Sequence, residues 1–193
     1  MDLAISEWIF STFHTNKAFA VFWAVISFLG NLWAFVVITA LLLCFKKTRK
    51  IGMFLAVSCG LVWVLNSLIL KPLIARPRPF MANPDLAGLC ELAGMSLPPE
   101  FSMASGHAAN SMAIAMTVFM FSKKWGGVVF IYPFMMGLSR ICLCVHYASD
   151  VLVGWVIGAA VAIACHYLLN LLIKYFVSKK EKKNGKVSSS ISE

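Results

Sequence analysis

The sequence contains little charge for its length. Charged residues make up 13% of the 193 residues and hydrophobic residues 60%, whereas a typical soluble domain is about a quarter charged and about half apolar. This composition argues against a soluble globular protein. Nucleic-acid binding is also disfavoured, because the net charge of +9 is concentrated in blocks that flank apolar runs, as the topology determinants of membrane proteins are.

The cysteines also lack a pattern. None of the six shows the paired spacing that is typical of a zinc site or of a secreted disulfide framework. Five lie inside apolar stretches, where small polarizable side chains usually serve packing. Cys90 is the exception, because it lies in a polar loop. We therefore expect the Cys90 thiol to react with an impermeant maleimide.

Long apolar runs dominate the rest of the chain. They cover residues 18–45, 51–70, 105–121, 126–145 and 151–173. The run 51–70 has 20 residues without a charge, and at about 1.5 Å per residue it spans the roughly 30 Å hydrocarbon core. The sequence therefore predicts an all-α polytopic membrane helix bundle with about five transmembrane helices. Six spans remain an alternative, because Gly30 and Asn31 interrupt the first run.

The chain is expected to have three regions. Residues 1–16 are too short to span and lack the basic start of a signal peptide. Their apolar residues, with Trp8 at the headgroup boundary, predict an interfacial helix. Residues 17–177 form the predicted membrane-embedded domain. Residues 178–193 are rich in Lys and Ser and are expected to form a disordered basic tail.

The basic residues predict which loops face the cytoplasm. Clusters at 46–50, 123–124 and 174–186 hold 12 of the 17 cations, and five alternating spans place all three clusters on one side. Cytoplasmic loops carry an excess of Lys and Arg, so we expect that side to be cytoplasmic. The opposite face then carries the Pro-rich loop 71–104 and the short connection 140–150.

Arginines indicate an anion site on that opposite face. The chain has 13 lysines and four arginines, yet Arg76, Arg78 and Arg140 lie where cations are disfavoured. Arg140 also lies in an apolar run, where an arginine costs roughly 2.5–3.5 kcal/mol on insertion scales. A guanidinium binds phosphate through two donors, and lysine adds a point charge. Lys71, Arg78 and Arg140 are therefore predicted to bind an anion. The alternative is snorkelling, or pairing with Asp85, Glu91 or Glu100.

Two of the four histidines lie on the same face. Asp150 follows His146 by four residues, which is one helical turn. Its carboxylate can accept from one ring nitrogen, fix the tautomer and leave the other nitrogen as a nucleophile.

His107 follows Ser105 and Gly106 at the start of the third apolar run. Backbone N–H groups at a helix N-terminus bind phosphate oxygens, and His107 can protonate a leaving oxygen there. His14 and His166 lack such neighbours and are interpreted as interface and packing residues.

Together these stretches resemble the signature of the type 2 phosphatidic acid phosphatase superfamily. They read Lys71-x6-Arg78-Pro79, Ser105-Gly106-His107 and Ser139-Arg140-x5-His146-x3-Asp150. Ten fixed positions in the right order leave little room for coincidence. Ala104 stands where the second motif usually begins with Pro, a departure that removes no chemical group.

The resemblance implies a role for each motif residue. His146 matches the nucleophile that forms a phosphohistidine, Asp150 the residue that orients it, and His107 the general acid. The positions that match phosphate ligands are Lys71, Arg78, Ser105, Gly106 and Arg140. No cofactor or metal is expected, because fixed cations supply the positive field and the outer face lacks a cluster of metal-ligating side chains.

The predicted function is hydrolysis of a lipid phosphate by a metal-independent integral membrane phosphatase. By resemblance it belongs in the bacterial inner membrane, with the site on the periplasmic or extracellular face and the basic tail in the cytoplasm. The loop after Arg78 contains acids and no cation, which disfavours a large multiply charged headgroup. Undecaprenyl diphosphate or phosphatidylglycerol phosphate is therefore favoured, with lipid A 1-phosphate as the runner-up.

Other classes remain alternatives. A small membrane transporter would need polar residues at mid-span, and Asn66 and Asn110 are polar residues within runs. The resemblance also extends to vanadium haloperoxidases, whose known members are soluble. The expected partners are the lipid phosphate substrate and membrane lipids, with no nucleic acid, and the oligomeric state is left open.

Overall fold

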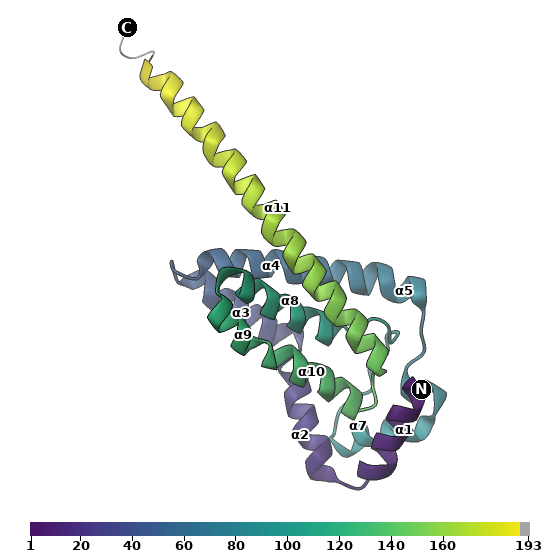
Figure 1. Ribbon diagram of the computed structural model, residues 1–193. Helices are drawn as coiled ribbons and strands as arrows, with labels where there is room; N and C mark the ends of the chain where they lie inside the picture. The colour runs from purple at the N-terminus through teal and green to yellow at the C-terminus, as the bar shows by residue number, and fades with distance from the viewer. Residues whose placement is uncertain (190–193) are drawn as a thin grey trace.

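The computed structural model describes the backbone of residues 1–189 and the side chains of residues 1–182, and its regular elements are all helical (Figure 1). The all-α prediction is thus confirmed. In chain order the elements are α1 (Asp2–Phe13), α2 (Lys17–Phe28), α3 (Leu32–Cys44), α4 (Arg49–Trp63), η1 (Val64–Leu70), α5 (Lys71–Ile74), α6 (Pro79–Ala82), η2 (Pro84–Ala87), α7 (Gly88–Leu92), α8 (Gly106–Phe121), α9 (Lys123–Val129), α10 (Ile131–Cys142) and α11 (Ala148–Ser189).

Three helical segments are long and apolar enough to cross a membrane. They are Arg49–Ala82, Lys123–Cys142 and Ala148–Lys182. The helices α2 and α3 meet at a bend of 44° and add a fourth candidate if the pair counts as one span. The helix α8 has 16 residues, fewer than the roughly 20 that a span requires. The chain is therefore a multi-pass membrane protein with three or four candidate spans in its described part, and the expected five are not shown.

The short helix α8 lies inside the bundle, where it packs against α4, α9, α10 and α11 (Figure 1). Small residues allow the closest of these contacts. A Cβ atom at Gly158 would lie 2.1 Å from the carbonyl oxygen of Ala109, and one at Gly154 would lie 2.8 Å from that of Ser105. Glycines four residues apart let two membrane helices approach at backbone distance. We call this contact between α8 and α11 the glycine seam.

The bend between α2 and α3 also has a local cause. Gly30 and Asn31, which interrupt the first apolar run, lie at this break. A Cβ atom at Gly30 would lie 2.6 Å from Cδ2 of His107, so glycine is needed for the close approach. The bend thus brings the α2–α3 connection against the start of α8.

The helix α1 packs on the segment that connects α6 to α8. Its Ile9 shares a buried apolar cluster with Leu86, Leu89 and Cys144. The expectation of an accessible Cys90 is wrong, because α7 turns this side chain inward, where it is 0% exposed. Burial raises the pKa of the Cys90 thiol to about 11, so the thiolate that reacts with maleimide is scarce at neutral pH.

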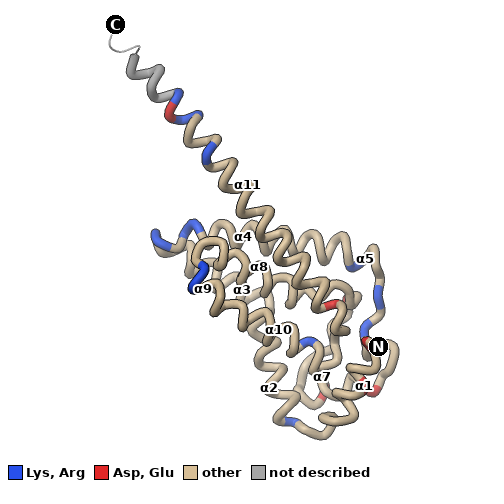
Figure 2. The backbone as a smooth tube through the Cα atoms, viewed as in Figure 1, with Lys and Arg blue, Asp and Glu red and all other residues tan. Residues whose placement is uncertain are grey.

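The basic residues form groups in different parts of the molecule. Lys and Arg lie where α4 and α9 begin and on the outer part of α11, whereas the arginines of the Pro-rich loop lie near α1 (Figure 2). The helix α11 continues through residues 178–189, where the composition predicts disorder, and residues 190–193 of that predicted tail lie outside the described residues. The division into three regions, and the side of the membrane each end faces, stay predictions.

Candidate active site

The motif residues lie where helices begin or end. Lys71 begins α5, Arg78 precedes α6, and Arg140 lies in the last turn of α10. His146 lies in the connection between α10 and α11, and Asp150 lies in the first turn of α11. The glycine seam and the backbone hydrogen bond from Ser105 N–H to the carbonyl oxygen of Asp150, 3.1 Å long, bring these ends together.

Ser105 caps α8. Its backbone is extended, and its hydroxyl accepts from the N–H of Ala108 at 3.5 Å. Such a cap satisfies one of the free donors at the helix N-terminus. Next to it, a Cβ atom at Gly106 would lie 3.4 Å from the amide nitrogen of Asn66. The Asn66 amide donates to the carbonyl oxygen of Ala104 at 3.1 Å, which fixes the turn before α8.

A cavity of about 550 Å³ joins the predicted site residues. Its polar lining consists mainly of the three predicted cations and both histidines, and its remaining walls come chiefly from α3, α4 and the loop before α8. The polar group is Lys71, Arg78, Arg140, His107 and His146 together with Ser67, Glu100 and Asn110, and the apolar group includes Leu32, Phe35, Cys59, Gly60 and Trp63. The structure thus brings the predicted cations, both histidines and Gly106 to one cavity, whereas Ser105 and Asp150 do not line it.

Arg78 fixes the tautomer of His146. Its Nη1 lies 2.8 Å from the carbonyl oxygen of Val145 and 3.3 Å from Nε2 of His146. A guanidinium can only donate, so Nε2 accepts and the ring proton resides on Nδ1. The Nε2 lone pair of His146 therefore faces the cations of the cavity.

Asp150 is satisfied by other donors. Its Oδ2 accepts from Ser102 Oγ at 2.5 Å and from the N–H of Tyr147 at 2.9 Å. The separation between Asp150 Oδ2 and Nδ1 of His146 is 3.6 Å, which is longer than a hydrogen bond. The expected direct hydrogen bond is therefore absent, and Ser102 Oγ, 3.4 Å from Nδ1, bridges the two residues.

The surroundings favour a neutral His146. The side chain is 2% exposed. This burial, together with the positive charges of Arg140 and Arg78, lowers its pKa below the usual value, although Asp150 acts in the opposite direction. A neutral imidazole is the form that carries a nucleophilic lone pair.

The two other cations are held differently. Lys71 forms an ion pair with Glu100, so the pairing that the sequence left as an alternative does occur for this residue. Arg140 is 5% exposed and donates to Ser27 on α2. Within the described part of the chain its Nε has no hydrogen-bond partner. A buried guanidinium with a free donor is ready to bind an anion.

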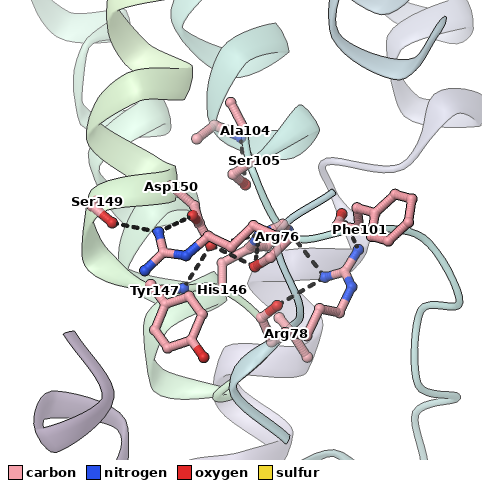
Figure 3. A network of polar contacts seen from close by, with 12 residues as sticks. Arg76, Arg78, Phe101, Ala104, Ser105, His146, Tyr147, Ser149 and Asp150 are labelled. Atoms are coloured by element: carbon pink, nitrogen blue, oxygen red, sulfur yellow. Dashed lines mark hydrogen bonds and ion pairs between the residues drawn. The ribbon is translucent and has the colours of Figure 1, made fainter. Parts of the chain in front are cut away.

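Sequence reasoning missed several residues that contact the motif side chains. Asn31 Oδ1 lies 3.3 Å from Nε2 of His107, and Ser102 touches both Asp150 and His146. Arg76 donates to Asp150 Oδ1 at 2.6 Å (Figure 3). The break in the first apolar run could have indicated Asn31, but no pattern in the sequence indicates Ser102.

Residues 1–182 contain no group of three or more His, Cys, Asp or Glu side chains placed to hold a metal ion. The expected metal independence of the site stays a prediction.

Known proteins resemble this chain. Residues 51–174 match the profile of the PAP2 superfamily. The chain is 36% identical over 132 residues to an undecaprenyl-diphosphatase of Sulfolobus acidocaldarius, an alignment that covers 67% of this chain and 61% of that protein. It thus spans less than two thirds of the length of that relative.

Two crystal structures share the fold. LpxE from Aquifex aeolicus superposes with a TM-score of 0.72 at 26% sequence identity, over 86% of this chain and 94% of that one. A transmembrane PAP2-type phosphatidylglycerolphosphate phosphatase from Bacillus subtilis superposes with a TM-score of 0.67 at 26% identity, over 88% of this chain and 84% of that one.

Proposed function

Because the chain belongs to the PAP2 superfamily, we propose that it is an integral membrane phosphatase that hydrolyses a lipid-linked phosphate or diphosphate. One observation carries the proposal: a single cavity joins three cations and two histidines to an apolar wall. A phosphate fits the polar part, and a hydrocarbon tail fits the apolar part.

The proposed reaction uses the two histidines for covalent and proton chemistry and the three cations for charge stabilisation. Nε2 of His146 attacks phosphorus, the bond from phosphorus to the lipid oxygen breaks, and His107 gives that oxygen a proton. Water then attacks the phosphohistidine, and His107 takes the proton of the water as the bond to nitrogen breaks. Lys71, Arg78 and Arg140 stabilise the charge on the equatorial oxygens, where fixed cations act most strongly.

The lipid is proposed to carry a compact headgroup. Leu32, Phe35 and Trp63 line the cavity and suit an acyl or prenyl chain. Between Arg78 and His107 the loop has no cation to attract a distant second phosphate. Undecaprenyl diphosphate or phosphatidylglycerol phosphate is favoured, and both the Sulfolobus relative and the Bacillus structure support this choice. Lipid A 1-phosphate is the runner-up.

We place the protein in a bacterial inner membrane with the cavity toward the outer leaflet. The basic starts of α4 and α9 lie away from the site arginines (Figure 2), and the positive-inside rule assigns such clusters to the cytoplasm. A lipid phosphate can then reach the cavity from within the bilayer.

The main test is phosphate release by the purified protein in EDTA. Undecaprenyl diphosphate, phosphatidylglycerol phosphate, lipid A 1-phosphate and a soluble sugar phosphate serve as substrates. We expect the highest kcat/KM for one of the first two, and inhibition by vanadate, which mimics five-coordinate phosphorus. Activity that disappears with EDTA and returns with Mg²⁺ would contradict the mechanism, and a preference for the soluble ester would contradict the lipid assignment.

A second test concerns the apolar wall. Gly60 lines the cavity, and a Cβ atom there would meet no neighbour within 4 Å. Gly60→Leu therefore adds apolar volume at the cavity wall without a clash at its Cβ atom. We expect kcat/KM to fall for lipid substrates while hydrolysis of a short-chain phosphate stays unchanged. Gly127→Leu is the matched control, because Gly127 is equally unobstructed and lies on α9 outside the cavity. Equal effects of the two variants would exclude a tail site at Gly60.

A further inference from the structure

The N-terminal helix α1 contains no motif residue, yet it reaches the catalytic centre through Arg76. The Nη1 atom of Arg76 lies 2.6 Å from Asp150 Oδ1 and 2.7 Å from Ser149 Oγ. Its Nη2 lies 3.0 Å from Oδ2 of Asp2, in the first turn of α1. One guanidinium thus joins Asp2 to Asp150 across the start of α11 (Figure 3 shows the inner part of this network).

The Arg76 guanidinium is held on more than its two carboxylates. Its central carbon lies 4.0 Å from the centroid of the Tyr147 ring, a distance at which a cation is attracted to the ring face. Ser149 also donates to Asp2. The planar group therefore has one orientation, in which one nitrogen faces Asp150 and the other faces Asp2. A rigid fork of this kind fixes a position more fully than a flexible lysine, which keeps the charge but not the two-sided geometry.

The opposite end of the network is anchored by packing. Ile9 on α1 is buried with Leu86 and Leu89, and the thiol of Cys144 donates to the carbonyl oxygen of Ser6 at 3.4 Å. The helix α1 therefore has a fixed place against the loops that bear the motifs. Asp2, on the first turn of α1, receives its position from this contact.

The inner end of the network determines how His146 is oriented. Asp150 is 0% exposed, and the loss of one partner of a buried charge is far more costly than the loss of an exposed pair. Arg76 holds Oδ1, which leaves Oδ2 to Ser102 and, through Ser102, to Nδ1 of His146. Without Arg76 the carboxylate is held only at Oδ2, by Ser102 and the Tyr147 N–H. The Ser102 bridge to Nδ1 of His146 is then less firmly placed.

We infer that Arg76 is a positioning residue for the nucleophile and that α1, through Asp2, is the element that holds Arg76 in place. The inference rests on the proposed function, because it concerns the orientation of His146 for attack. Arg76 lies outside the cavity, so its effect should be on the chemical step and not on substrate binding.

The test measures kcat and KM of the full-length protein in detergent with one lipid phosphate. We expect Arg76→Gln to lower kcat by about tenfold or more and to change KM by less than about twofold, as expected when an interaction acts on the transition state. Arg76→Lys should recover part of the loss. Asp2→Asn should lower kcat several-fold, and should have little further effect when it is combined with Arg76→Gln, because coupled residues are non-additive.

Control variants separate the possible failures. Arg49→Gln removes an arginine that bonds a backbone carbonyl at the far end of α4, and Asp85→Asn removes a loop acid; both should keep wild-type kcat. If His146→Ala is as active as the wild type, the proposed function is wrong. If His146→Ala is inactive while Arg76→Gln and Asp2→Asn match the wild type, only the present inference is wrong.

Folding is measured on each variant by thermal unfolding. If Arg76→Gln does not fold, the positioning role is tested with Asp2→Asn and Arg76→Lys instead. Wild-type kcat in both of these variants would overturn the inference. A rise in KM with unchanged kcat would also overturn it, because that pattern belongs to a residue that contacts substrate.

Discussion

The two histidines of the cavity are held in different ways. His146 is 2% exposed and has Arg78, Ser102 and Asp150 around its two ring nitrogens. His107 is half-buried, and among the described residues its one side-chain hydrogen-bond partner is Asn31, at 3.3 Å. A nucleophile needs one orientation and one tautomer, whereas a general acid must exchange its proton with leaving group and water. The difference in support matches the two proposed roles.

The largest effect is expected when the proposed nucleophile is removed. His146→Ala deletes the atom that is proposed to form the covalent bond, so we expect at least a roughly 1000-fold fall in kcat. The measurement is phosphate release, with trapping of ³²P-labelled protein as a second readout. His166→Ala is the control, because this histidine lies among Phe54 and Phe121, away from the cavity. Residual activity above a few per cent would show that another residue attacks phosphorus.

The second-largest fall in kcat is expected from the loss of His107, the proposed general acid. His107→Ala should reduce kcat by about 100-fold or more, in line with the usual contribution of proton transfer. The loss should be smaller for a substrate with an acidic leaving group, such as p-nitrophenyl phosphate, because such a group leaves without a proton. Equal losses on both substrates would contradict the assignment of His107 as the acid.

The bridge between Asp150 and His146 gives an intermediate effect. Ser102→Ala removes the hydroxyl that contacts both residues, and we expect kcat to fall about tenfold, because the imidazole is less well oriented. Ser111→Ala, which removes a buried hydroxyl bonded to its own helix, controls for the loss of a buried serine. If the two variants have equal kcat, Ser102 has no part in orientation.

The partner of His107 should matter less. Asn31→Ala is expected to lower kcat only several-fold, because the imidazole keeps its place at the start of α8 without this contact. Asn170→Ala removes an amide that bonds a helix carbonyl far from the site and should have no effect. A loss as large as that of His107→Ala would mean that both histidines depend equally on their neighbours.

The smallest effect is expected from the titration of His146. The proposed nucleophile is neutral His146, and burial lowers its pKa below 6.5, so protonation should begin to reduce kcat/KM only at a pH below that value. Between pH 7.5 and about pH 6.5 we therefore expect His146 to cause less than a twofold change. A pH–rate profile measures this directly. An acid limb near pH 7 would show that His146 is solvated in the working enzyme.

Chemistry that is encoded locally could be predicted from the sequence, and contacts between distant segments could not. The positions of Arg78 and Arg140 predicted that the two side chains act together, and the structure brings both to one cavity. His146 and Asp150 are one turn apart as predicted, but the expected direct hydrogen bond between them is absent. Arg76 and Asp2 meet across 74 residues, which no spacing reveals. Cys90 was misplaced because a polar loop was expected to be open, whereas α7 packs its thiol against Leu143 and Val145.

The apolar runs predicted helices better than they predicted spans. Residues 105–121 are apolar, and the helix α8 forms there, but its surroundings are protein: Ala108, Ala109 and Ala113 are 0% exposed. A run with hydrophobic residues on all sides reads the same in lipid and in a protein core. Composition therefore cannot separate the two cases, and length must do so. At 16 residues α8 is shorter than a membrane span requires.

The glycine seam has a consequence for how such a protein can diversify. It joins the start of α8, which carries His107, to the start of α11, which follows His146, so the reacting groups share one rigid frame. The apolar wall of the cavity belongs to α3 and α4, which contribute neither histidine. If the proposed roles hold, mutations in that wall can change which hydrocarbon chain is accepted while the distance between His107 and His146 is conserved. Substitutions in α3 and α4 can thus change the lipid preference of such a protein while the two histidines keep their positions.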